Sequence, residues 1–184
     1  MIALLVVLAL AVAILLWAIL VYNGLVRMRN MVQEAWSGID VQLKRRTDLI
    51  PNLVSTVKGY AEHEKGTLEE VIRLRGLAQN AQGVGETAQA QGLLGAALGK
   101  LFALAESYPE LKANANFAQL QASLGEIEEQ VQLSRRYYNG AARNLNIAVE
   151  SFPSNLVAGR FGFEKAEFFE LESPAERAVP KVEF

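Results

Sequence analysis

The sequence predicts an all-α protein, in which an N-terminal transmembrane helix is followed by an elongated antiparallel helical bundle and a short C-terminal tail. Two observations carry this prediction: the chain begins with an uninterrupted apolar stretch, and its later apolar residues recur at helical spacing. We expect about four helices in the bundle, with coiled-coil-like packing, because a seven-residue apolar period runs from Ala113 to Phe152. The predicted parts are an anchor over residues 1–22, the bundle over 23–172 and an irregular, exposed tail over 173–184.

The anchor prediction rests on residues 2–21, which include no charged residue, proline or glycine. About 20 apolar residues match the roughly 30 Å hydrocarbon core of a bilayer, and a helix satisfies its own backbone polar groups there. Trp17 and Tyr22 lie toward the polar end of the stretch, where amphipathic rings favour the headgroup level. We therefore expect a retained membrane anchor.

Two other interpretations of this stretch stay open. A cleaved signal peptide is consistent with the A-x-A spacings of Ala9 with Ala11 and of Ala11 with Ala13. Against it, the segment lacks a basic region before the apolar run, and the run continues past both sites. A core helix of a soluble protein is disfavoured, because such helices are rarely apolar on every side.

Basic residues follow the apolar stretch, at Arg27, Arg29, Lys44, Arg45 and Arg46. Cytoplasmic flanks of membrane helices carry an excess of lysine and arginine. This rule predicts a single-pass protein with its N-terminus outside and its C-terminal domain in the cytoplasm. Arg27 and Arg29 either face lipid headgroups, which makes membrane lipids an expected partner, or serve only to set the topology.

From Asn23 onward the apolar residues occupy one face, so we expect a single helix to leave the membrane and continue into the bundle. Pro51 interrupts this pattern. Because proline lacks the N–H for an i−4 bond and crowds the preceding turn, a kink or a restart of the helix is predicted there. Thr47 or Asp48 is then placed to cap the segment that follows.

Helix-capping and helix-breaking residues divide the rest of the chain into further helices. Thr67 and Glu70 have the spacing of a capping box and predict the start of a second helix. The expected helices cover about 68–82, 86–107 and 113–152, and a short helix with an extended piece packed back on the bundle covers 156–171.

The densest group of polar residues comprises Lys44, Arg45, Arg46, Asp48, Pro51 and Asn52. As a binding surface, this group would receive an acidic partner or a lipid headgroup. As structure, Arg46 and Asp48 would pair across the kink, while Asn52 caps backbone groups that the proline leaves free. The structural interpretation is favoured.

Catalytic and metal-binding patterns are not found in the sequence. The chain has no cysteine and one histidine, His63, which lacks the second histidine of the H-E-x-x-H zinc motif. We therefore expect no metal, no cofactor and no enzymatic activity. A hydrolase would need an acid–base pair, whereas the carboxylates scatter at the spacing of solvated helix faces. The formal net charge of −2 gives no case for nucleic acid as a partner.

Several different motifs follow one another in a specific order along the chain. They are Tyr22–Val26, Glu34–Ser37, Ile39–Arg46, Asp48–Val54, Glu106–Ala113 and Phe152–Asn155. In order and spacing they resemble the signature of the LemA family, over nearly all of the chain after the anchor. One departure is Leu145–Asn146, where the family usually repeats a tyrosine–asparagine pair.

The resemblance implies a bacterial, single-pass protein of the inner membrane, with an α-helical cytoplasmic bundle over 23–172 and no established enzymatic activity. A magnetosome membrane protein belongs to the same family, which favours a role in membrane organisation.

Two functions are therefore expected from the sequence. The first is a membrane-anchored, non-catalytic scaffold that forms a homo-oligomer and organises membrane or partner proteins. The alternative is an accessory or sensor subunit whose bundle binds a membrane enzyme or a small ligand. The heptad seam and the helix leaving the bilayer favour the scaffold.

Overall fold

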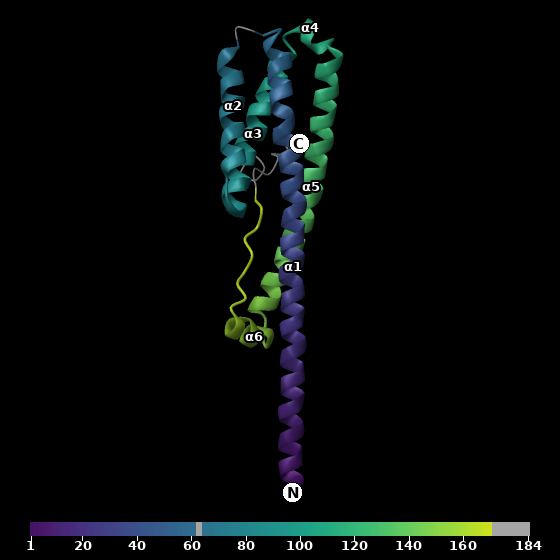
Figure 1. Ribbon diagram of the computed structural model, residues 1–184, viewed down its shortest axis with the longest axis vertical. Coiled ribbons are helices and arrows are strands. Elements are labelled where there is room, and N and C mark those ends of the chain that lie inside the picture. The colour runs from purple at the N-terminus through teal and green to yellow at the C-terminus, as the bar shows by residue number, and fades with distance from the viewer. Residues whose placement is uncertain (62–63, 171–184) are drawn as a thin grey trace, which may run out of the picture. The chain divides into compact units, whose positions relative to one another are not determined.

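The computed structural model describes residues 1–61 and 64–170, and every regular element in those ranges is an α-helix (Figure 1). The prediction of an all-α fold with a long apolar N-terminal helix is thereby confirmed. His63 and the tail predicted over 173–184 lie outside the described residues. The helices are α1 (Ile2–Lys58), α2 (Lys65–Asn80), α3 (Gly83–Ala105), α4 (Pro109–Lys112), α5 (Ala115–Glu150) and α6 (Ser154–Phe161).

Contacts divide the chain into two compact units. The first unit joins residues 1–38 to 136–167, and the second joins the described residues of 39–135 to residues 168–170. Because α1 and α5 are long, each of them contributes one part to the first unit and another part to the second.

The second unit is built around one apolar core. Its α1 part supplies Ile50, Leu53 and Val57 at alternating steps of three and four, and all three side chains are fully buried. The other helices add apolar side chains at similar spacing, chiefly Val71, Leu74, Leu94, Leu98, Leu101, Phe117 and Leu124. The helical periodicity of the sequence therefore marks the faces that pack.

Of the two outcomes predicted at Pro51, a kink or a restart of the helix, the restart is wrong, because α1 continues through this residue to Lys58. The missing N–H leaves the carbonyl of Thr47 without its helical donor. The Nε–H of Arg75, from α2, donates to that carbonyl at 2.9 Å. Thr47 and Asp48 are not caps either: the Thr47 hydroxyl donates to the carbonyl of Lys44 at 2.9 Å, within the helix.

The predicted boundaries of α2 and α3 are each off by a few residues. No side chain caps α2, which begins at Lys65, so the expected capping box at Thr67 is wrong. The helix α3 begins at Gly83, before the predicted start at residue 86. The φ of Gly83 is +74°, a value that glycine adopts without strain. The Glu86 carboxylate accepts a hydrogen bond from the Gln82 backbone N–H at 3.1 Å and stabilises this helix start.

The predicted seam helix corresponds to α5 (Ala115–Glu150). Most seam positions are buried, including Leu124, Val131, Tyr138 and Leu145. Phe152, expected as the last seam residue, lies beyond α5 and is 80% exposed. After it come α6 and an extended piece, as predicted for this region.

Candidate functional site

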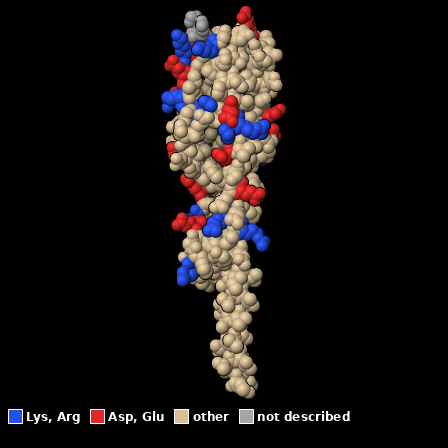
Figure 2. All heavy atoms as spheres, viewed as in Figure 1, with Lys and Arg blue, Asp and Glu red and all other residues tan. Residues whose placement is uncertain are grey.

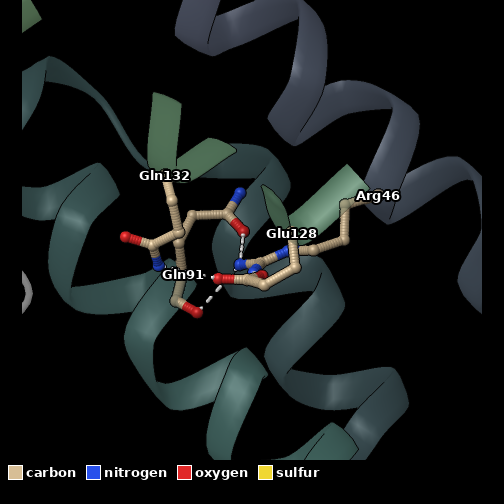
Figure 3. A network of polar contacts seen from close by, with 4 residues as sticks. All are labelled: Arg46, Gln91, Glu128 and Gln132. Carbon is tan, nitrogen blue, oxygen red and sulfur yellow. Dashed lines mark hydrogen bonds and ion pairs between the residues drawn. The ribbon is translucent and has the colours of Figure 1, made fainter. Parts of the chain in front are cut away.

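A buried arginine lies among three helices of the second unit. Arg46 of α1 is 5% exposed and is surrounded by Gln91 of α3 and by Glu128 and Gln132 of α5 (Figure 3). Its Nη1 donates to the Glu128 carboxylate at 2.7 Å. Its Nη2 donates to the backbone carbonyl of Gln91 at 2.9 Å and also to the Oε1 of the same residue.

The network extends beyond this ion pair. Gln132 donates from Nε2 to the second oxygen of Glu128 at 3.1 Å, so both carboxylate oxygens are engaged. The Glu128 side chain is 45% exposed, whereas the Arg46 side chain is 6% exposed. Among the described residues, the Arg46 Nε is the buried side-chain polar atom that has no hydrogen-bond partner. An unpaired buried donor costs free energy, so this N–H has the capacity to bind an acceptor.

The four residues of this network line a groove of about 770 Å³, whose other lining residues come mostly from α3 and α5. Volumes of this size are typical of small-molecule sites. Small residues of α3 leave the groove open, since they have little or no side chain to fill it. They are Ala88, Gly92, Gly95, Ala96 and Gly99, and Gly125 faces the groove from α5.

The structure separates the polar group that was predicted around Pro51. Lys44 and Asp48 form an exposed ion pair at 3.3 Å, and Arg45 donates to the Gln42 side chain at 3.0 Å. The expected pair of Arg46 with Asp48 is therefore wrong, because residues two apart lie on different faces of a helix. Glu128 takes the place of Asp48.

The remaining members of that group, Pro51 and Asn52, are exposed. The backbone carbonyl of Asn52 accepts a hydrogen bond from the Thr56 hydroxyl at 2.9 Å, one turn later in α1. Among the described residues, no hydrogen bond or ion pair joins Pro51 or Asn52 to the Arg46 network. Of the six residues in the predicted polar group, Arg46 is the one that contributes to a buried site.

The two juxtamembrane arginines have different surroundings within the first unit. The guanidinium of Arg29 lies 5.2 Å from the centre of the Phe163 ring, a cation–π distance. Arg27 is exposed and lines an open groove of about 450 Å³, together with Met28 and Met31 of α1 and Ile147 of α5. Arg27 is thus the more available of the two for a headgroup.

Tyr138 holds the extended piece of the first unit. Its ring packs edge-on against Trp36 with 5.5 Å between centroids, and its hydroxyl donates to the Glu167 carbonyl at 2.8 Å. Burial, and the nearby charge of Glu167, raise the pKa of the Tyr138 hydroxyl. Asn146 pairs twice with the backbone of Ala166, at 2.9 and 2.7 Å.

Sequence reasoning missed Gln91, Glu128 and Gln132. Glutamine and glutamate on a helix ordinarily indicate a solvated face, and Glu128 is separated from Arg46 by 82 positions. One available signal was the run of small residues at steps of three and four in α3, which marks a helix face with room beside it.

Comparison with known proteins assigns the family. The LemA family model matches residues 35–184. Magnetosome protein MamQ 2 of Paramagnetospirillum magneticum is 31% identical over 180 residues, which cover 84% of this chain and 66% of that protein. MamQ of Magnetospirillum gryphiswaldense is 27% identical, with the same coverage. Protein LemA of Metamycoplasma hominis is 27% identical over 150 residues, 80% of this chain and 68% of that protein. The chain thus spans 66% of the length of the MamQ relatives, and with this family match it belongs to the LemA family.

Proposed function

We propose that this chain is a membrane-anchored, non-catalytic scaffold that self-associates and organises membrane or partner proteins. The observation that carries the proposal is the continuity of α1, which runs from Ile2 to Lys58. One helix therefore holds both the apolar stretch and residues packed in the two units. A protein built in this way couples a membrane segment to a helical bundle without an intervening linker.

The apolar stretch has the properties of a membrane segment. Figure 2 shows the N-terminal part of α1 as a stem without lysine, arginine, aspartate or glutamate. The helix qualifies as a candidate membrane span by length and composition, and its most apolar window is not buried by the rest of the chain. Side chains such as Leu4 and Leu20 are 73% and 72% exposed, which water disfavours and lipid favours.

The proposed location is supported by the basic flank and by the names of the relatives. The basic residues after the stretch favour a cytoplasmic bundle and an outside N-terminus at the bacterial inner membrane. Three of the relatives are named magnetosome proteins. That name supports a role in membrane organisation for this chain. Confinement to a membrane also raises the effective concentration of copies, which favours self-association.

Crosslinking of the full chain in native membranes, at its normal expression level, tests the scaffold. We expect a ladder of homo-oligomers, and the same complexes after gentle detergent extraction and size-exclusion chromatography with mass determination. A species of monomer mass in both measurements would contradict the proposal.

A second candidate is a sensor or accessory subunit that binds a small ligand. It is favoured by the groove of about 770 Å³ and by Arg46, a lining residue whose Nε has no hydrogen-bond partner. Arg46 and Glu128 neutralise one another, so the groove suits an apolar molecule with one neutral acceptor oxygen.

Photolabelling with a diazirine-bearing monoacylglycerol tests this second candidate on the full chain in lipid nanodiscs. Labelling of α3 should be lost in Gly99→Leu, which fills the groove; a β-carbon at this position meets no atom within 4 Å. Gly76→Leu is the matched control, since its β-carbon is equally free and Gly76 is not among the groove residues. Equal labelling of the two variants would exclude the groove as the site.

A further inference from the structure

The end of the apolar stretch is packed against aromatic residues from the C-terminal region. Within the first unit, the Tyr22 ring lies 4.9 Å from Phe161 and 5.6 Å from Phe163, measured between centroids, in edge-on geometry. Phe161 is the last residue of α6. The helix α6 is thus held beside the residue that marks the polar end of the candidate membrane span, and Figure 1 shows α6 next to α1.

Apolar side chains around α6 remain exposed. The helix buries Val157 and Ala158. Phe152, Leu156 and Phe161 are 80%, 61% and 58% exposed. Single exposed apolar residues are common on proteins, whereas three large ones within ten positions, beside the end of a membrane helix, indicate a contact surface.

Two exposed basic residues of the first unit are suited to a lipid interface. Arg160 of α6 is exposed, and so is Arg27, which lies five residues beyond Tyr22 in α1. A surface that combines aromatic and aliphatic side chains with arginine is typical of segments that lie in the headgroup region.

Of the acidic residues of the extended piece, the exposed Glu164 directly follows Phe163, whereas Glu167 lies further from the span. The piece begins at Phe163, beside Tyr22, and reaches Glu167, whose carbonyl is bound by Tyr138. Tyr138 packs on Trp36, which is 14 residues after Tyr22 in the sequence, or about 21 Å along α1 at about 1.5 Å per residue. Glu167 is therefore separated from the level of α6, and it does not oppose contact with anionic headgroups.

We propose that Phe152 and α6 form a second membrane contact, which lies in the headgroup layer beside the anchor. The partner is the lipid surface itself, with anionic headgroups near Arg27 and Arg160. This inference rests on the proposed membrane anchoring. Lipid is favoured over a second copy of the chain, because the surface adjoins the span through Tyr22 and its basic residues complement anionic lipid.

Fluorescence quenching from lipid tests the contact. The chain has no cysteine, so a single introduced cysteine carries the only label. Leu156→Cys reports on α6, Leu20→Cys on the anchor and Ile72→Cys on α2, where Ile72 is 53% exposed. Each bimane-labelled full chain is placed as one copy in a nanodisc of phosphatidylcholine and phosphatidylglycerol, with or without lipid that carries a doxyl group near the headgroup.

We expect the doxyl lipid to quench the fluorescence of labels at positions 20 and 156. The fluorescence of the label at position 72 should not change. Quenching at 20 but not at 156 would overturn the second contact and leave the anchor intact. The absence of quenching at 20 would overturn both. With unlabelled Leu156→Cys chain in vesicles and an added oxidant, a disulfide between copies, together with no quenching of the labelled chain in the nanodisc, would assign the surface to a second copy and also overturn the inference.

A variant separates the apolar contact from simple proximity. Phe152→Ser with Phe161→Ser should reduce quenching of a label at position 156, because the exposed apolar area that enters the lipid is removed. The label at position 20 should be unaffected. Undiminished quenching at 156 in this variant would contradict a role for these side chains.

Discussion

The side chain of Arg75 completes the backbone hydrogen bonding of α1 at Thr47. Its Nε–H lies 2.9 Å from the Thr47 carbonyl oxygen. In a regular helix, this carbonyl would accept from the N–H of residue 51, and residue 51 is proline. Since Thr47 is 3% exposed, solvent has little access to the acceptor. An arginine from α2 therefore compensates for a proline in α1 and links the two helices.

Removal of this donor should destabilise the second unit. We expect Arg75→Leu to lower the free energy of unfolding by about 1–3 kcal/mol, the usual cost of leaving a buried carbonyl unpaired. Chemical denaturation followed by circular dichroism measures the change. In a Pro51→Ala background, where the backbone N–H is restored, the same substitution should cost less. An equal cost in both backgrounds would show that the arginine does not replace the missing N–H.

Glu128 should matter more than an exposed carboxylate of the same cluster. Glu128→Leu leaves the buried Arg46 without its charged acceptor, and we expect a loss of about 1.5–3 kcal/mol in unfolding free energy. Asp48→Leu is the control, because its pair with Lys44 is exposed, and it should change stability by about 0.5 kcal/mol or less. Adding Arg46→Met to Glu128→Leu should recover part of the loss. Equal effects of the two single substitutions would contradict this assignment.

Stability should fall at high pH through Tyr138. Burial raises the pKa of its hydroxyl, so the folded chain keeps this proton to higher pH than the unfolded chain does. The stabilisation is fully present below the ordinary tyrosine pKa of about 10 and is lost as the pH rises through the folded value. Thermal unfolding between neutral pH and pH values above the tyrosine pKa measures the effect.

The corresponding variant is Tyr138→Phe. It should lose about 1 kcal/mol at neutral pH, from the missing hydrogen bond to Glu167, and should show a weaker decline at high pH. Burial and Glu64 also raise the pKa of Tyr108, so Tyr108→Phe defines the part of the decline that belongs to the second unit. A decline identical in Tyr138→Phe and in the unsubstituted chain would remove Tyr138 as its source.

Close approach of anchors should depend on small residues. Ala9 and Ala13 are separated by four positions, a small-xxx-small spacing that favours helix association in membranes. Replacement of both by isoleucine should weaken crosslinked homo-oligomers in native membranes, whereas the size-conserving Leu10→Ile should not. Leu124→Asp, in the core of the second unit, should instead unfold the bundle. Unchanged crosslinking in the alanine variant would place self-association elsewhere on the chain.

The sequence predicts those features that depend on local pattern. The apolar stretch before Tyr22 and the buried faces of α1 and α5 follow from spacing alone, because helical periodicity is set by neighbours within two turns. The short helix expected within 156–171 is observed as α6 (Ser154–Phe161), two residues earlier at its start.

Features that depend on distant residues were not predictable. A proline ordinarily ends a helix. The residues near Pro51 give no indication that Arg75, 28 positions after Thr47, donates a hydrogen bond to the Thr47 carbonyl. Arg46 had an acidic neighbour in sequence, Asp48, but helix geometry turns the two side chains apart. Its actual partner, Glu128, is recognised only when α1 and α5 have been brought together by packing in the second unit.

If α1 spans a membrane as proposed, its unbroken course makes the conformation of the first unit sensitive to bilayer thickness. A spanning helix whose apolar length exceeds the bilayer thickness adapts by tilting. Here the helix that would tilt is the helix to which Phe161 and Phe163 are fixed through Tyr22. Hydrophobic mismatch is therefore transmitted as torque to the first unit instead of being dissipated at a joint.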